Sequence, residues 1–176
     1  MQRWIALLRG VNVGGVTIRS AELAELFRGL GFDDVRTVLA SGNVVFETTK
    51  REAHAALKRR IEQALAERFG YDAWIVLVTR AELERAIEAF PFDADDARRQ
   101  PWVIFATDHV VVDELLKAAA DPDPDVDPLA AGDGVLYWNP VKGTTVQTPF
   151  AKLIGKAKYK PVTTNRNLRT LQKILG

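Results

Sequence analysis

The sequence contains no cysteine. This absence excludes disulfide bonds, thiolate metal sites, iron–sulfur clusters and cysteine nucleophiles. The chain also lacks long hydrophobic runs. The apolar run that begins at Trp4 is about five residues long, whereas the core of a signal peptide needs roughly 7–15. Since no other segment approaches the length of a membrane span, we expect a cytoplasmic protein without a membrane segment.

The composition is that of a globular protein, but the charge is unevenly distributed. Of the 176 residues, 47% are hydrophobic and 27% are charged, and the net charge is +1. Residues 1–83 carry 12 basic and 10 acidic groups, residues 84–133 carry 4 and 13, and residues 134–176 carry 8 and 0. The basic C-terminal part either meets an outside polyanion or folds back onto the acidic middle segment. The balanced total favours the second interpretation.

The first half of the chain alternates between strand and helix signals. Apolar or β-rich runs predict strands, and apolar residues at helical spacing before a glycine predict helices. The strands are expected at residues 3–9, 35–39, 43–47 and 73–78, and the helices at residues 21–30 and 51–69. This β-α-β-β-α-β order is that of ferredoxin-like folds. Both faces of the first and last strands are apolar, so we expect both to be buried.

The second half predicts a similar unit after a linker at residues 91–100 (PFDADDARRQ). A helix at 81–89 precedes this linker. The expected elements beyond it are strands at 102–106, 126–129, 134–138 and 159–163, and helices at 110–120, 149–155 and 165–175. The sequence therefore predicts an α+β protein of two ferredoxin-like halves with antiparallel sheets and extra helices. The N-terminal domain would span residues 1–90, and the C-terminal domain, with its basic terminal helix, residues 101–176.

The glycine-rich stretch LLRGVNVGG, Leu7–Gly15, raises the possibility of a phosphate-binding loop. It lacks both the G-x-G-x-x-G spacing and the P-loop lysine, and it does not lead directly into the next predicted helix. Residues 11–18 instead alternate about Gly14 and Gly15, a pattern typical of a two-residue hairpin turn. We therefore favour a strand that ends at Arg9 and is followed by a hairpin or ordered loop.

A second polar motif, Ser41-Gly42-Asn43, joins two predicted strands and by default is a turn. In the ferredoxin-like order, strand three pairs antiparallel with strand one, so its start lies beside the end of strand one. We expect five residues to cluster there: Arg9, Gly10, Asn12, Ser41 and Asn43. A guanidinium with amide and hydroxyl neighbours can hold a carboxylate or phosphate, and equally it can join two loops.

The C-terminal segment TTNRNLRTLQKIL predicts a helix with a basic face formed by Arg166, Arg169 and Lys173. Arg166 and Asn167 would lie in its first turn, beside free backbone N–H groups that favour an anion. A solvated basic face is the commoner meaning of such a pattern.

Catalytic and metal-binding patterns are weak. His54 and His109 have no partner at metal-type spacing, so we interpret both as structural. The acidic run from Asp121 to Asp127 lacks the glycine and glutamate of a calcium loop, and no G-x-S-x-G motif occurs. We predict no catalytic residues, no metal site and no cofactor, and we do not favour an enzyme.

Three separated motifs together resemble a known bacterial family, the uncharacterised domain of unknown function 1697. They are ALLRGVNVGG at residues 6–15, SGNVVF at Ser41–Phe46, and the pattern Thr164-x-Arg166-Asn167-x-x-Thr170. The resemblance implies two α+β, ferredoxin-like halves and no established activity, substrate or cofactor. The chain departs from the family pattern at Leu168, where a tryptophan is common. That ring either contacts a ligand in other members or belongs to the core, where leucine fills the space.

Three hypotheses for function follow, and the oligomeric state stays open in all of them. The first is binding of an anionic small ligand, such as a nucleotide or phosphometabolite, by the loops at Arg9–Asn12 and Ser41–Asn43 together with Arg166 and Asn167. The second is binding of nucleic acid by the basic C-terminal segment, with Tyr159 and nearby lysines as a platform. The third is a metal-independent enzyme that uses Arg9 with Asp108 or His109.

Overall fold

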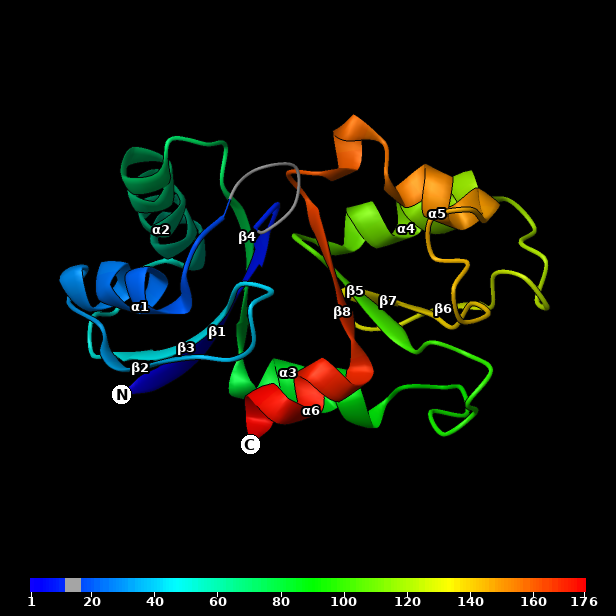
Figure 1. Cartoon of the computed structure of the whole chain (residues 1–176), viewed down its shortest axis with the longest axis horizontal. Coiled ribbons are helices and arrows are strands. Elements are labelled where there is room, and N and C mark those ends of the chain that lie inside the picture. Colours follow the sequence, from blue (N-terminus) through cyan, green and yellow to red (C-terminus); the bar gives the residue numbers. More distant parts are fainter. Residues whose placement is uncertain (12–16) are drawn as a thin grey trace. The chain divides into compact units, whose positions relative to one another are not determined.

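The computed structural model describes residues 1–11 and 17–176. By their internal contacts these residues form two compact units, Met1–Leu83 with Lys173–Gly176, and Glu84–Gln172. Each unit contains a four-stranded antiparallel sheet with helices between its strands (Figure 1). The predicted α+β architecture of two halves is therefore confirmed. In the part of the chain that is described, no helix is both long enough and apolar enough to cross a membrane.

The first unit has the predicted β-α-β-β-α-β order. Its elements are β1 (Gln2–Arg9), α1 (Ser20–Gly29), β2 (Asp33–Thr37), β3 (Asn43–Thr48), α2 (His54–Phe69) and β4 (Trp74–Thr79). The sheet order is β2-β3-β1-β4, with every neighbouring pair antiparallel. The hairpin expected about Gly14 and Gly15 lies outside the described residues.

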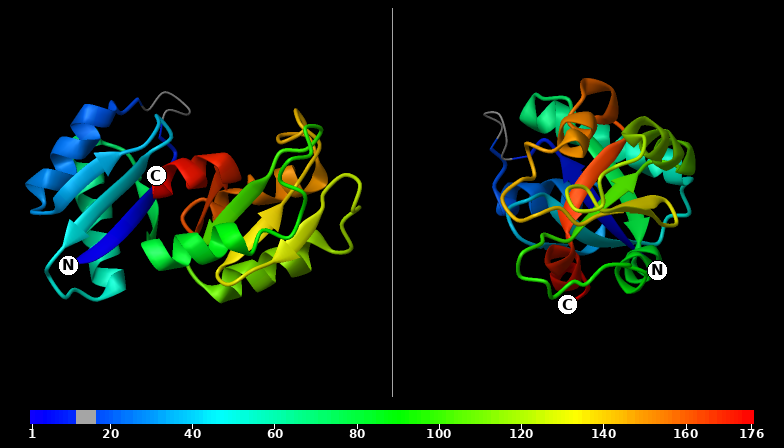
Figure 2. Two further views of the ribbon diagram at one scale, coloured as in Figure 1. Left: turned by 90° about the horizontal axis from the view of Figure 1, so that it is seen from below. Right: turned by 90° about the vertical axis from the view of Figure 1, so that its right-hand side faces the viewer.

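Both faces of the first sheet are buried, as the apolar alternation predicted. Trp4, Ala6 and Leu8 on one face of β1 pack in a core with side chains from α1 and α2. Figures 1 and 2 show these two helices on the same side of the sheet. On the opposite face, Ile5 and Leu7 are 2% and 0% exposed. The central strand therefore contributes apolar area to two layers of packing.

The second unit repeats the strand order with different lengths. After α3 (Arg80–Glu88) come β5 (Trp102–Ala106), α4 (His109–Ala119), β6 (Leu129–Ala131), β7 (Val135–Trp138), α5 (Pro149–Ile154), the short 3₁₀ helix η1 (Ala157–Tyr159), β8 (Thr163–Asn167) and α6 (Leu168–Leu175). The sheet order is β6-β7-β5-β8. Helices α4 and α5 lie along one side of this sheet (Figures 1 and 2), where Ile104, Leu136 and Trp138 pack with them.

The end of the second unit differs from the prediction. A strand was expected at residues 159–163 and a helix from residue 165, but the strand is Thr163–Asn167 and the helix begins at Leu168. The strand TTNRN is polar, so side-chain pattern gave no signal for it. Its backbone pairs with β5, from Ala106 opposite Thr163 to Trp102 opposite Asn167, and this tertiary pairing overrides the local preference.

By internal contacts, the division between the two units lies within α3, between Leu83 and Glu84. Two contacts explain this: the Tyr137 hydroxyl donates to the Ala86 carbonyl oxygen at 2.7 Å, and the rings of Phe90 and Tyr137 lie 5.6 Å apart. Ala86 of α3 and Phe90, two residues beyond the helix, therefore contact Tyr137 of the second sheet.

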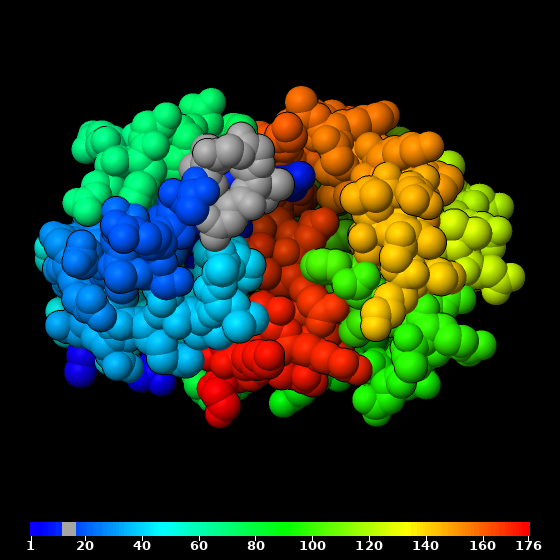
Figure 3. All heavy atoms as spheres, in the orientation of Figure 1, coloured from blue at the N-terminus to red at the C-terminus, as the bar shows by residue number. Residues whose placement is uncertain are grey.

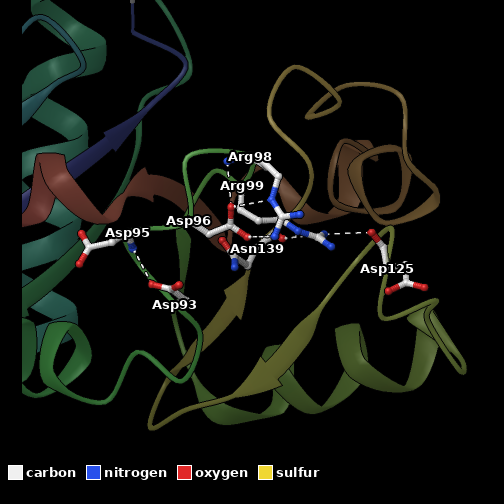
Figure 4. A network of polar contacts seen from close by, with 7 residues as sticks. All are labelled: Asp93, Asp95, Asp96, Arg98, Arg99, Asp125 and Asn139. Carbon is white, nitrogen blue, oxygen red and sulfur yellow. Dashed lines mark hydrogen bonds and ion pairs between the residues drawn. The ribbon is translucent and has the colours of Figure 1, made fainter.

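Hydrogen bonds also join the predicted linker to the second unit and the C-terminus to the first. Gln100 N donates to Pro140 O at 3.0 Å and Lys142 N donates to Arg98 O at 2.8 Å. Figure 4 shows this segment, in which the Asp96 carboxylate accepts from Arg98 Nε and Nη2 at 3.0 and 3.1 Å. At the other end, Arg36 Nη2 donates to Ile174 O at 2.9 Å, which holds the last residues against the first unit.

A buried carboxylate joins the second sheet to α5. Asp127 is 2% exposed; its Oδ1 accepts from Trp138 Nε1 at 2.9 Å and its Oδ2 accepts from Phe150 N at 3.0 Å. The turn at residues 141–148, which connects β7 to α5, lies on the surface shown in gold in Figure 3. Asp127 therefore fixes both ends of this exposed connection. In the sequence it was indistinguishable from the exposed aspartates beside it.

Replacing Asp127 by asparagine should destabilise the second unit. The carboxamide of asparagine has one oxygen, so its NH₂ group faces one of the two donors, Trp138 Nε1 or Phe150 N, and that donor loses its acceptor. We therefore expect a loss of about 1–3 kcal/mol in the free energy of unfolding. Urea unfolding followed by tryptophan fluorescence measures this loss. The matched control is Asp125→Asn at an exposed position, for which a change within about 0.5 kcal/mol is expected. Equal effects of the two substitutions would contradict the assigned role.

Candidate functional site

Arg9 ends the central strand of the first sheet. It is paired with Trp74 of β4, and its side chain is half-buried. Burial lowers the pKa of Arg9 from its ordinary value, because removal of water disfavours the charged guanidinium. An anion beside such a group interacts with it more strongly than in bulk water, since the local dielectric constant is lower. Gly10 follows, exposed and with a φ of 80°.

The Ser41-Gly42-Asn43 motif lies beside this strand end. Leu7 of β1 is opposite Asn43 of β3 in the antiparallel register, and Leu8 N donates to Gly42 O at 2.9 Å. The register therefore places the Ser41-Gly42-Asn43 turn beside Leu7 and Leu8, the residues that precede Arg9 and Gly10. The fifth residue expected in this cluster, Asn12, lies outside the described residues.

Asn43 builds the turn that precedes β3. Its side chain is buried, and its Nδ2 donates to Val38 O and to Ser41 Oγ, both at 2.8 Å. Val38 N in turn donates to Asn43 O at 2.9 Å. Since both Nδ2 hydrogens are used in this way, Asn43 holds the turn closed and positions the exposed Ser41, which carries the hydroxyl group of the motif.

Gly42 has a steric reason to be glycine. Its φ is 75°, and a Cβ added there would lie 2.9 Å from the Cβ of Leu8. Only a residue without a side chain lets the turn approach β1 this closely. At Gly10, by contrast, no atom of the residues that the structure describes, other than its chain neighbours, lies within 4 Å of an added Cβ.

The second predicted group, Arg166 and Asn167, belongs to the second unit and lies in a strand. The prediction that both residues lie in the first turn of a helix is wrong, because they end β8. Arg166 is buried, and its Nη1 donates to Thr164 Oγ1 at 2.7 Å and to Asn165 O at 2.8 Å. Asn167 Oδ1 accepts from Arg169 N at 3.0 Å, as in a helix cap. Arg166 therefore does not share a helical face with Arg169 and Lys173.

The platform of Tyr159 and lysines suggested for nucleic acid is not formed. Tyr159 is 1% exposed, so its ring offers no surface on which a base could stack. Lys158 Nζ instead lies 2.6 Å from Glu114 Oε1, and this hydrogen bond lowers the pKa of the Glu114 carboxyl. The pair joins the basic C-terminal segment to the acidic middle segment, as the intramolecular interpretation of the charge pattern expected.

Of the two residues considered for proton transfer, Asp108 has a structural role. Asp108 Oδ1 accepts from Val110 N and Val111 N at 2.8 and 3.2 Å and so caps α4. His109 is exposed, with its Nε2 3.5 Å from Asp133 Oδ1. His54 Nε2 lies 2.9 Å from Leu77 O. Within residues 1–11 and 17–176, no group of three histidine, cysteine or acidic residues could hold a metal ion.

The fold and site together define a protein of two α+β halves, with a half-buried arginine and a polar turn at one end of its first sheet. The model of the family described as protein of unknown function, DUF1697, matches residues 1–137, and the chain belongs to this family. The match covers the first two of the three motifs. A search of curated proteins gave no match.

Among solved structures, the chain is similar to the conserved bacterial protein SP0830 from Streptococcus pneumoniae. The sequences are 24% identical, the alignment covers 99% of this chain and 97% of the other, and the TM-score is 0.80. This likeness shows that the two proteins share a fold. The departure from the family pattern at Leu168 falls in the core, since this side chain is 3% exposed.

Alanine substitutions at Gly10 and Gly42 should separate the cost of a left-handed backbone from the added cost of a steric clash. Gly10→Ala should cost about 1–2 kcal/mol of unfolding free energy, the ordinary cost of a left-handed residue. Gly42→Ala adds the clash with Leu8, so its cost should be about 2–4 kcal/mol. Urea unfolding of both variants measures the difference. If Gly42→Ala is no more destabilising than Gly10→Ala, the close approach of the turn to β1 is not a constraint.

Proposed function

We propose that this protein binds an anionic small ligand, such as a nucleotide or phosphometabolite, at the end of β1. The observation that carries the proposal is the half-buried guanidinium of Arg9, whose pKa is lowered by desolvation. Arginine presents a planar fork of donors that matches a carboxylate or phosphate in two parallel hydrogen bonds. Arg9 is therefore the residue that would bind the negatively charged group of the ligand.

The neighbouring loop supports this proposal with a second polar group. Ser41 is exposed, and its Oγ accepts from Asn43 Nδ2 at 2.8 Å, which orients the hydroxyl. Gly10 is exposed and has no side chain to cover the backbone beside Arg9. A small anion approaching Arg9 would therefore find a hydroxyl and an open main chain next to the guanidinium.

Arg166 and Asn167 have a smaller part in the proposal than the sequence suggested. Arg166 Nη1 is already bonded to Thr164 and Asn165, and Asn167 Oδ1 caps α6. Both residues contribute to the local structure of β8 and its connection to the last helix. We therefore assign the recognition of the ligand to Arg9 and Ser41.

Arg9→Gln should reduce the thermal stabilisation that an anionic ligand gives. At ten times its Kd, a ligand that binds only the folded state stabilises it by about 1.4 kcal/mol, which raises Tm by several degrees. We expect this rise for the unmodified protein with ATP or inorganic phosphate at about 10 mM and low ionic strength. In Arg9→Gln the part of the rise that comes from binding at Arg9 should be lost, and in Arg9→Lys this part should shrink because lysine lacks the fork.

The control is Arg59→Gln, which removes the same charge from an exposed position on α2. Its ligand-induced rise in Tm should equal that of the unmodified protein. The proposal fails if no anion raises Tm at this concentration, or if Arg9→Gln keeps the full rise.

A further inference from the structure

A hollow of about 480 Å³ lies in the first unit and is lined by Lys50, Arg51, Glu52 and Arg60. The first three residues connect β3 to α2, and Arg60 lies in α2. The end of β3 pairs with the beginning of β1, with Thr48 opposite Gln2. The hollow is therefore at the end of the sheet opposite to Arg9, which is the last residue of β1.

Arg60 forms a fixed wall of this hollow. Its Nε and Nη2 donate to the two carboxylate oxygens of Glu52 at 3.2 and 2.9 Å, and its Nη1 donates to Leu30 O at 3.0 Å. The guanidinium carbon also lies 4.8 Å from the centre of the buried Phe32 ring. These contacts set the plane of the guanidinium and pair the single carboxylate of the lining with Arg60.

Lys50 and Arg51 supply positive charge that the lining does not compensate. Both are exposed, and across residues 1–11 and 17–176 neither side chain makes a hydrogen bond or ion pair. The lining holds three basic groups and one acidic group, so its net charge is +2. A concave surface with this excess attracts anions, and a doubly charged anion would balance it.

We propose that this hollow is an anion-binding site for the phosphate monoester class, with Lys50 and Arg51 as the residues that contact the phosphate. The hollow is open to solvent, and its volume of about 480 Å³ leaves room for a phosphate group. A phosphate monoester carries close to two negative charges near neutral pH, which matches the lining. Arginine offers a fork to two phosphate oxygens, and lysine adds a point charge on a flexible stem.

Little in the local sequence indicates this site. Lys50-Arg51-Glu52 reads as an ordinary charged connection between a strand and a helix, and Arg60 as one of several basic residues on the helix surface. Only the packing of α2 beside the end of β3 places the four side chains around one hollow. The site is independent of the proposed function, because it uses none of the residues around Arg9.

Titration of the ¹⁵N-labelled full chain with inorganic phosphate at low ionic strength tests the proposal. We expect saturable amide shifts at residues 49–54 and 60, and none with chloride at the same ionic strength. In Lys50→Gln/Arg51→Gln the affinity should fall by about tenfold or more, since each lost hydrogen bond to a charged group weakens binding by that order. Both side chains are exposed, so the variant should fold normally.

The control variant Arg28→Gln/Arg59→Gln removes two charges from exposed positions on α1 and α2. It should bind phosphate as the unmodified protein does. The proposal is overturned if phosphate causes no shifts at residues 49–54 and 60, if the double variant at Lys50 and Arg51 binds with unchanged affinity, or if the control weakens binding equally. In Arg9→Gln the shifts at residues 49–54 and 60 should persist. The titration therefore tests this hollow independently of the site proposed at Arg9.

Discussion

The antiparallel pairing of β1 with β3 is the constraint on which the first unit depends. Its register places Leu7 opposite Asn43 and Gln2 opposite Thr48. A shift by one residue would turn every buried side chain of β1 to the other face of the sheet. The same register fixes what lies at each end of the sheet: the turn of Ser41 beside Arg9 at one end, and the connection at Lys50 and Arg51 at the other.

Several polar and glycine residues that stand out in the sequence have structural roles that do not depend on a ligand. Asn43 closes the turn through Val38 and Ser41, and Gly42 allows the turn to contact Leu8. In the second unit, Asn167 caps a helix and the buried Asp127 joins β7 to α5. A motif residue can therefore be required by the fold alone, and exposure and unused donors are better indicators of binding than membership in a motif.

The charge distribution of the chain has a local physical basis in both units. The Lys158–Glu114 pair connects a segment rich in lysine with one rich in acidic residues, although exposed pairs of this kind contribute little to stability. In the first unit, Lys50 and Arg51 carry the excess positive charge of the hollow, whereas Arg60 pairs with Glu52. The surroundings of single side chains decide where positive charge gathers, and the net charge of +1 does not reveal these places.

Much of the fold follows from local sequence, because apolar periodicity and glycine stops are strong signals. The runs at Trp4–Leu8 and Val44–Phe46 and the helical spacing of Leu57, Ile61 and Leu65 determine the strands and helices of the first unit, and pairing rules then place Ser41 near Arg9. The polar strand Thr163–Asn167, the burial of Tyr159 and Asp127, and the hollow at Lys50 were decided only by tertiary structure. They depend on backbone pairing and on packing between segments distant in the chain, and these interactions leave no periodic signature in the residues themselves.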